Sequence, residues 1–260
     1  MTPEPYDAGW MPGETYDRLR AEDFAKLCAA ASLDHNAHVP TCPEWDVRAL
    51  CDHLARVYQA RAFTIEHSTP KSSDDFELLA SDADPIAWVR TWSDTLNDAL
   101  SRHDDGDPTI SFLPEANTMH FWRRRMALET FVHRTDAELA TGVVSAMDDE
   151  LSADGVDEML WFGSRKSPTR HADGSPASSV VAMAGPHHRW VVTLNHSELL
   201  IGNTDDAPDA TVHSSAPALL LALSGRDLAG IGAERFGVAL PVVEGNLAAF
   251  DRLLTRLGSF

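Results

Sequence analysis

The sequence predicts an α+β protein of two domains, an N-terminal four-helix bundle followed by a smaller α+β domain. Four amphipathic segments, with apolar residues at helical spacing, fill the first half of the chain, as in a four-helix bundle. A Gly/Ser/Pro/His-rich stretch, GSRKSPTRHADGSPAS, then separates this half from a region of short β-rich runs. The length of 260 residues accommodates one large domain or two of ordinary size.

The domain boundaries are predicted from changes in composition. Residues 1–13 hold three prolines and two glycines, which favours a flexible arm. We expect the bundle and a linking helix to occupy residues 14–163. The C-terminal α+β domain should then cover residues 164–260.

The first three helices of the bundle are predicted from their apolar stripes and end signals. The first spans about residues 14–32, and the two prolines of HVPTCPEWD prevent it from continuing. The second spans about residues 47–67, with Asp46 as a candidate N-cap. The third starts at Pro85, since proline is tolerated in the first turn of a helix.

The fourth helix, RRRMALETFVHRTDAELATG, carries the candidate site. Asn117 or Thr118 can cap its start, and Gly142 stands where a helix end favours a left-handed residue. Its inner stripe begins as apolar core and continues with two carboxylates and an imidazole. The stripe consists of Trp122, Met126, Glu129, His133, Asp136 and Ala140.

The C-terminal half is predicted to mix helices and strands. A short helix should run from Ser152 to Trp161, another from Pro217 to Ser224, and a last one should follow Asn246 as its cap. Pro186-His187-His188 suggests a hairpin turn. The predicted strands are SVVAMA (179–184), RWVVTLN (189–195), ELLIGN (198–203), ATVHS (210–214) and GVALPVVEG (237–245), and the last helix should bury Leu247, Phe250, Leu253, Leu254 and Leu257.

Composition excludes several classes of partner. The net charge of −19 argues against nucleic acids and anionic membranes, because their phosphates would be repelled. No apolar run approaches the length of a membrane span, and the N-terminal residues do not resemble a signal peptide. An odd count of three cysteines, Cys28, Cys42 and Cys51, favours reduced packing thiols in a cytoplasmic protein. Monomer and homodimer both stay open.

Three residues could hold a metal ion. Glu129 and His133 lie one turn apart on the fourth helix, so their side chains point to the same side. His53 lies at the edge of the buried face of the second helix. Two imidazoles and a carboxylate suit zinc, and would also suit iron(II). The alternatives are a surface Glu–His pair and a histidine packed in the core.

Two neighbours on the fourth helix could support this site. Asp136, one turn beyond His133, could orient that ligand, or could be a solvated charge or a helix-end partner. Arg125, four residues before Glu129, could hold the Glu129 carboxylate or a substrate carboxylate.

Two stretches, TCPEWDVRALCDHLARV at 41–57 and RRMALETFVHRTDAELATG at 124–142, resemble the mycothiol-dependent maleylpyruvate isomerase family, within the wider DinB-like metal-binding bundles. A weaker match, LLLALSGR at 219–226, is followed by VVEGN. The first stretch departs from the family's usual Pro-Gly-Trp because Glu44 replaces the glycine. The resemblance implies that His53, Glu129 and His133 bind zinc. It also implies that Arg226 contacts substrate or thiol cofactor at the active site, whereas position alone is compatible with an ordinary surface arginine.

The resemblance further implies an activity. Mycothiol is the low-molecular-weight thiol of actinobacteria, and zinc would bind its sulfur and favour the thiolate. The thiolate would add to a small electrophile as cofactor of a cis–trans isomerase. An S-transferase that releases a thioether and a non-catalytic small-molecule-binding module are the alternatives.

Overall fold

The computed structural model describes residues 9–165, 178–184, 188–195, 198–202 and 207–257. Its contacts divide the chain into two compact units, residues 1–144 and 145–260. The division lies before α5 (Asp149–Arg165) and not after residue 163 as expected, because α5 packs on helices and a strand of the second unit. Most of the expected linker, and residues 1–8 of the expected arm, lie outside the described residues.

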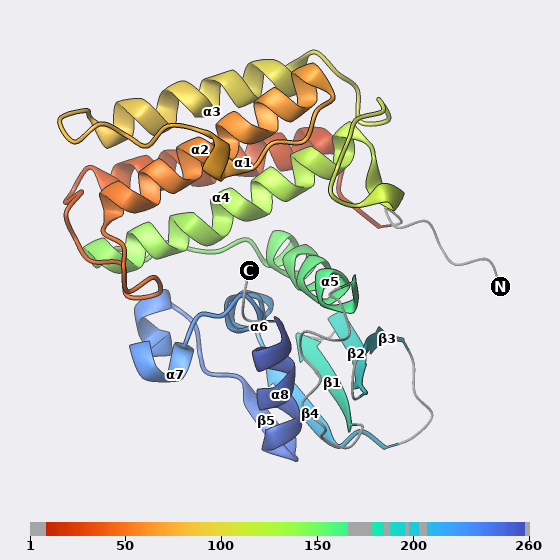
Figure 1. The fold of residues 1–260 in the computed structure, drawn as a ribbon. Helices are drawn as coiled ribbons and strands as arrows, with labels where there is room; N and C mark the ends of the chain where they lie inside the picture. The colour runs from red at the N-terminus through yellow and green to blue at the C-terminus, as the bar shows by residue number, and fades with distance from the viewer. Residues whose placement is uncertain (1–8, 166–177, 185–187, 196–197, 203–206, 258–260) are drawn as a thin grey trace. The chain divides into compact units, whose positions relative to one another are not determined.

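The described part of the first unit contains four long helices (Figure 1). α1 packs against α4, α2 packs against α3, and α2 also contacts α4. This arrangement confirms the predicted bundle. The helices are α1 (Gly13–Ala31), α2 (Val47–His67), α3 (Pro85–Ser101) and α4 (Met119–Thr141), with short 3-10 turns at Ser73–Asp75 and Pro114–Ala116.

Most of the predicted helix ends are confirmed. The Asp46 side chain accepts from the amide of Ala49 at 2.8 Å, and α3 starts at Pro85. Gly142 ends α4 with a φ of 73°, in the left-handed region that suits glycine.

The predicted cap of α4 is wrong in its detail. Thr118 occupies the N-cap position, but its side chain makes no capping hydrogen bond, and α4 starts at Met119. The Asn117 side chain instead accepts from the amide of Ser111 at 2.8 Å, so it stabilises the preceding loop.

A buried charge network fixes α1 against α4 next to the candidate site. The Arg134 side chain is fully buried. Its Nε lies 3.2 Å from Oδ1 of Asp23 on α1, and its Nη1 donates to Glu138 at 2.8 Å. Because Arg134 directly follows His133, these contacts help to hold the rotation of α4 that turns His133 toward α2.

The second unit contains one five-stranded sheet of order β3-β2-β1-β4-β5. β1 and β2 pair antiparallel, as a hairpin requires, although the turn at residues 185–187 lies outside the described residues. β4 pairs parallel to β1 and antiparallel to β5. The strands are β1 (Ser178–Ala184), β2 (His188–Leu194), β3 (Leu199–Ile201), β4 (Ala210–Ser214) and β5 (Val242–Gly245), and the helices besides α5 are α6 (Ala216–Leu223), α7 (Leu228–Ile231) and α8 (Leu247–Leu257).

Three predictions for this unit are corrected. α5 starts before Ser152, because the Asp148 carboxylate accepts from the amide of Leu151 at 2.8 Å and caps the helix earlier. The strand expected over residues 237–245 is shorter, since β5 pairs with β4 only from Val242 onward. Leu247 is 57% exposed, because it lies about a third of a turn from the centre of the stripe that α8 buries, and Leu254 is only partly buried.

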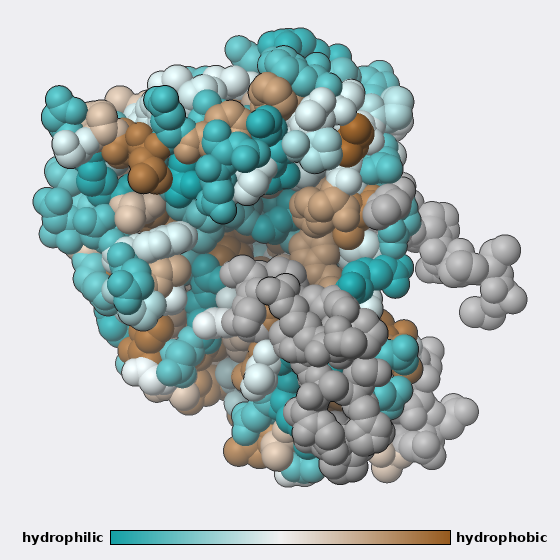
Figure 2. Space-filling view, in the orientation of Figure 1, coloured by the Kyte–Doolittle hydropathy of each residue, from teal (hydrophilic) through white to brown (hydrophobic). Residues whose placement is uncertain are grey.

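The visible surface of the helical unit is mostly hydrophilic. Figure 2 shows hydrophilic residues over most of the visible face of the helical unit, interrupted by smaller apolar patches. Within the described residues, no helix is both long and apolar enough to cross a membrane.

Candidate metal centre

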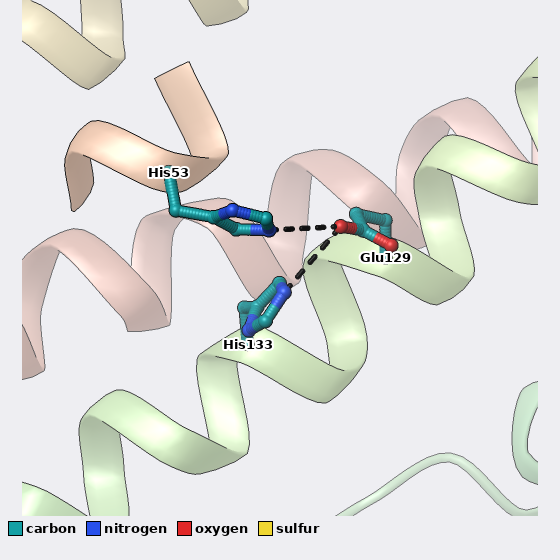
Figure 3. A group of neighbouring side chains, drawn as sticks. All are labelled: His53, Glu129 and His133. Carbon is teal, nitrogen blue, oxygen red and sulfur yellow. Dashed lines mark ion pairs between the residues drawn. The ribbon is translucent and has the colours of Figure 1, made fainter. Parts of the chain in front are cut away.

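The structure brings His53, Glu129 and His133 together (Figure 3). Nε2 of His53 lies 3.6 Å from Oε1 of Glu129, and Nε2 of His133 lies 3.4 Å from the same oxygen. All three candidate ligand atoms lie within 4.8 Å of one another. Both imidazoles therefore approach a single carboxylate oxygen, from α2 and from the next turn of α4.

These separations suit a small divalent cation. Zinc bonds of about 2.0–2.2 Å place neighbouring tetrahedral ligand atoms about 3.3–3.6 Å apart. The two nitrogen–oxygen distances fall in this range, and nitrogen and oxygen are ligands that zinc accepts. Three protein ligands would leave one tetrahedral position for a thiol or water. Iron(II) fits the same donor set.

Asp136 supports His133 from the opposite side of the ring. Its carboxylate is fully buried, and its Oδ2 lies 3.0 Å from Nδ1 of His133. The Thr41 hydroxyl donates to the other oxygen, Oδ1, at 2.7 Å. The solvated-charge alternative for Asp136 is therefore wrong, and Nδ1 faces Asp136 while Nε2 faces Glu129.

Arg125 contacts the remaining oxygen of Glu129. Its Nη2 donates to Oε2, so Oε1 faces the two histidines. Burial raises the pKa of Glu129, but the charge of Arg125 and the contacts with His133 and His53 outweigh it and hold that pKa well below its usual value. Glu129 is therefore ionised, as a metal ligand must be.

When no metal is bound, the His133 ring holds an extra proton, which balances the negative charge of Glu129. Burial lowers its pKa, but the hydrogen bonds to Asp136 and Glu129 outweigh this effect and raise the pKa to about 9. Below that pH the ring is an imidazolium held between two carboxylates. A metal ion on Nε2 would take the place of this proton.

Two residues of the loop before α2, neither of them predicted from the sequence, complete the surroundings. The Trp45 ring lies 4.8 Å from the His53 ring and 6.3 Å from the His133 ring, between ring centroids. Thr41 contacts Asp136 as described above. Both lie in the first stretch that carries the family resemblance, which is the signal that could have pointed to them.

The remaining predicted residues are Arg226 and the cysteines. Arg226 belongs to the second unit, where Gly225 ends α6 with a φ of 83°, and Nη1 of Arg226 donates to the Ser224 carbonyl at 2.7 Å. Its place at the metal residues stays a prediction. Cys28 and Cys51 are fully buried. Burial raises the pKa of both thiols, that of Cys51 to about 12, which agrees with packing roles.

Comparisons with known proteins point to one family. Residues 18–138 match the family described as mycothiol maleylpyruvate isomerase N-terminal domain, which confirms the predicted resemblance. A solved mutant of a mycothiol-dependent maleylpyruvate isomerase has a similar fold, with a TM-score of 0.59, 14% identity, and coverage of 83% of this chain and 90% of the other. A second structure of such an isomerase gives a TM-score of 0.56 at 13% identity with the same coverage. No curated protein matches the chain.

Proposed function

Because residues 18–138 match the N-terminal domain of the mycothiol maleylpyruvate isomerase family, we propose that this chain is a zinc-dependent enzyme that uses mycothiol. Its reaction is a cis–trans isomerisation of a small electrophile. The observation that carries the proposal is the convergence of three ligand atoms, from His53, Glu129 and His133, within 4.8 Å.

Each residue of the site has a stated task. His53 and His133 offer neutral imidazole nitrogens, and Glu129 offers one carboxylate oxygen. A zinc ion held by these residues would lower the pKa of a thiol and so favour the thiolate near neutral pH. Asp136 fixes the ring of His133, while Arg125 keeps Glu129 ionised and occupies its second oxygen.

The proposed reaction conserves atoms and electrons. Mycothiol would supply a thiolate that adds to one carbon of an activated double bond, with the electron pair moving into the neighbouring electron-withdrawing group. The single bond left by this addition would allow rotation, and elimination of the thiolate would restore the double bond in the trans arrangement. The surrounding protein must hold the substrate during rotation and exclude a competing proton donor.

One experiment tests the function. The purified chain is assayed for bound metal and then incubated with zinc, mycothiol and a panel of cis-alkene electrophiles, with mass spectrometry as readout. We expect about one zinc per chain and an isomerised product without an adduct. A stable thioether adduct would instead identify an S-transferase. Neither product from any electrophile, together with tight zinc binding, would favour a non-catalytic module.

Two variants make this experiment specific. His133→Ala should lose most of the zinc and the activity while the bundle stays folded, because the ligand set is then incomplete. His67→Ala removes an exposed histidine at the end of the same α2 that carries His53, and should leave both unchanged. Full zinc occupancy in His133→Ala would refute the metal assignment.

A further inference from the structure

Arg61 on α2 is a half-buried cation about two turns beyond His53, and the charge of Glu129 is near enough to oppose the lowering of its pKa by burial. Its guanidinium carbon lies 5.2 Å from the centroid of the Trp122 ring on α4. Within the described residues it makes no hydrogen bond and no ion pair. In contrast, Arg56 on the same helix pairs with Asp52 at 3.1 Å. A guanidinium that is partly removed from water without a hydrogen-bonding partner is costly unless something else binds it.

The position of Arg61 follows from a row of side chains on α4. Trp122, Arg125 and Glu129 stand at steps of three and four residues, so they share one side of the helix. Arg61 contacts the start of this row, and His53 contacts its end at Glu129. The distance along α4 from Trp122 to Glu129 is about 10 Å, so a molecule of several bonds would reach from Arg61 to the metal residues.

The charges nearby leave room for an anion. Burial lowers the pKa of Arg61 first, the positive charge of Arg125 lowers it further, and Glu129 opposes both effects. Within the described residues Glu129 makes no ion pair with Arg61; Arg125 engages one of its oxygens and the two histidines approach the other. The nitrogens of Arg61 are not among the fully buried polar atoms that lack a partner in the described part of the chain. Each of them therefore keeps some exposed surface on which an anion could bind.

Local charge balance indicates how many negative charges would bind. The charges of Glu129 and Asp136 cancel those of Arg61 and Arg125. A divalent cation with two neutral imidazoles then adds two positive charges. One thiolate and one carboxylate would restore neutrality, which is favourable where water is partly excluded.

We propose that Arg61 is a specificity-determining residue that binds a carboxylate of the substrate beside the metal residues. Arg125 adds its charge to this position, and the Trp122 ring holds the Arg61 guanidinium in place. The substrate class is then an electrophile whose carboxylate lies several bonds from the reacting double bond. The inference rests on the proposed function for its role in turnover, but not for anion binding itself.

Maleate probes the anion site at Arg61 alone, because this small dicarboxylate is shorter than the distance of about 10 Å from the Arg61 contact to the metal residues. Its binding to the full-length chain is measured by calorimetry, with zinc loaded and after treatment with a chelator. Dimethyl maleate has the same carbon skeleton without charge. We expect wild type to bind maleate in both states, and Arg61→Gln to bind it about ten- to hundredfold more weakly, as for the loss of a charged hydrogen bond. The maleate affinity of Arg61→Lys should lie between those of wild type and Arg61→Gln, because lysine keeps the charge but lacks the planar guanidinium that binds a carboxylate through two nitrogens.

Further measurements test whether weaker maleate binding reflects a lost carboxylate contact, a packing defect or a change in net charge. Arg102→Gln removes an exposed arginine that pairs with Glu66 at 3.0 Å, and should leave maleate binding unchanged. The thermal midpoint and zinc content of Arg61→Gln should stay near those of wild type. Dimethyl maleate should not distinguish Arg61→Gln from wild type in either metal state.

Several results would overturn the inference. One is the absence of maleate binding to wild type, and another is equal binding to wild type and Arg61→Gln. If Arg102→Gln weakened maleate binding as much as Arg61→Gln, the change in affinity would come from the net charge of the protein and not from a site at Arg61. Maleate binding by the metal-free protein does not involve mycothiol, so failure of the thiol reaction and failure of the Arg61 site are distinguishable.

Discussion

Oδ2 of Asp136 lies 3.0 Å from Nδ1 of His133, on the side of the ring opposite Glu129. The other oxygen of Asp136 accepts the Thr41 hydroxyl at 2.7 Å. This pair fixes the ring orientation of His133 and leaves Nε2 facing Glu129, where the proposed metal ion would bind. A buried carboxylate behind a ligand also makes the imidazole a stronger donor.

Asp136→Asn should weaken zinc binding by about 10- to 100-fold, the usual cost of changing the partner of a metal-ligating histidine. The amide keeps the shape of the side chain but removes its charge. Competition with a chromogenic zinc chelator measures the affinity. Thr41→Val is the matched variant, and a smaller loss is expected because Asp136 keeps its contact with His133. Wild-type affinity in Asp136→Asn would show that Asp136 does not support the metal.

The pH dependence of the metal-free protein should reveal His133. Its folded pKa of about 9 lies above the ordinary 6.5, so protonation stabilises the folded state. This contribution is fully present below about pH 6.5 and is lost as the pH rises through about 9. It should reach the order of 3 kcal/mol.

Urea unfolding of chelator-treated wild type and His133→Gln provides the measurement. The difference in unfolding free energy should be largest near pH 6 and should shrink toward pH 9. The lowered pKa of Glu129 stabilises the protein above about pH 4.5 and loses its effect in acid, outside this window. Zinc affinity should rise with pH over the range in which the stabilising contribution of His133 falls, since zinc must displace the proton. A pH-independent difference would contradict the expected imidazolium.

The cysteines should be dispensable for the thiol chemistry. Cys51 is buried, and its pKa of about 12 leaves almost no thiolate at neutral pH. A thiol-specific colorimetric reagent at pH 8 should therefore react slowly with Cys28 and Cys51 in the native protein. A variant with Ser at Cys28, Cys42 and Cys51 should keep its turnover per folded molecule. Lost turnover with fold and zinc intact would make one of them a nucleophile.

Arg226→Ala tests the role that the resemblance implies for the second unit. Zinc content and thermal midpoint should change little, because the contact of Arg226 with the Ser224 carbonyl is local. Catalytic efficiency should fall by about 10- to 100-fold, as for the loss of a charged hydrogen bond to substrate or thiol. Arg235→Ala, in the same unit, is the control and should retain wild-type kinetics. Unchanged kinetics in Arg226→Ala would identify it as an ordinary surface arginine.

Local features of the fold were predictable from the sequence. The start of α2 behind Asp46, the start of α3 at Pro85 and the end of α4 at Gly142 depend on residues within one turn of each other. The shared side of Glu129 and His133 follows from the helical repeat alone. The start of α5 was not predicted, because Asp148 and Ser152 are both acceptable cap residues and only the packed helix selects between them.

The candidate site was predictable only in part. His53 was singled out from the edge of its apolar stripe, and the family resemblance joined it to the residues of α4. No pattern within either stretch indicated that Thr41 would meet Asp136, which is 95 residues further along the chain. Nor did any sequence pattern indicate that Arg61 would contact the Trp122 ring.

The helical repeat, which can be read from the sequence, therefore defines which side chains stand together on each helix. Which helix faces meet depends on the packed fold, and so do the choice of the Glu129 oxygen that faces the histidines and the residues that hold Asp136 and Arg61. The physical reason is that the backbone repeat fixes neighbours within a helix at short range. The contact of α2 and its preceding loop with α4 depends instead on the packing of the whole bundle, including the buried Arg134 network between α1 and α4.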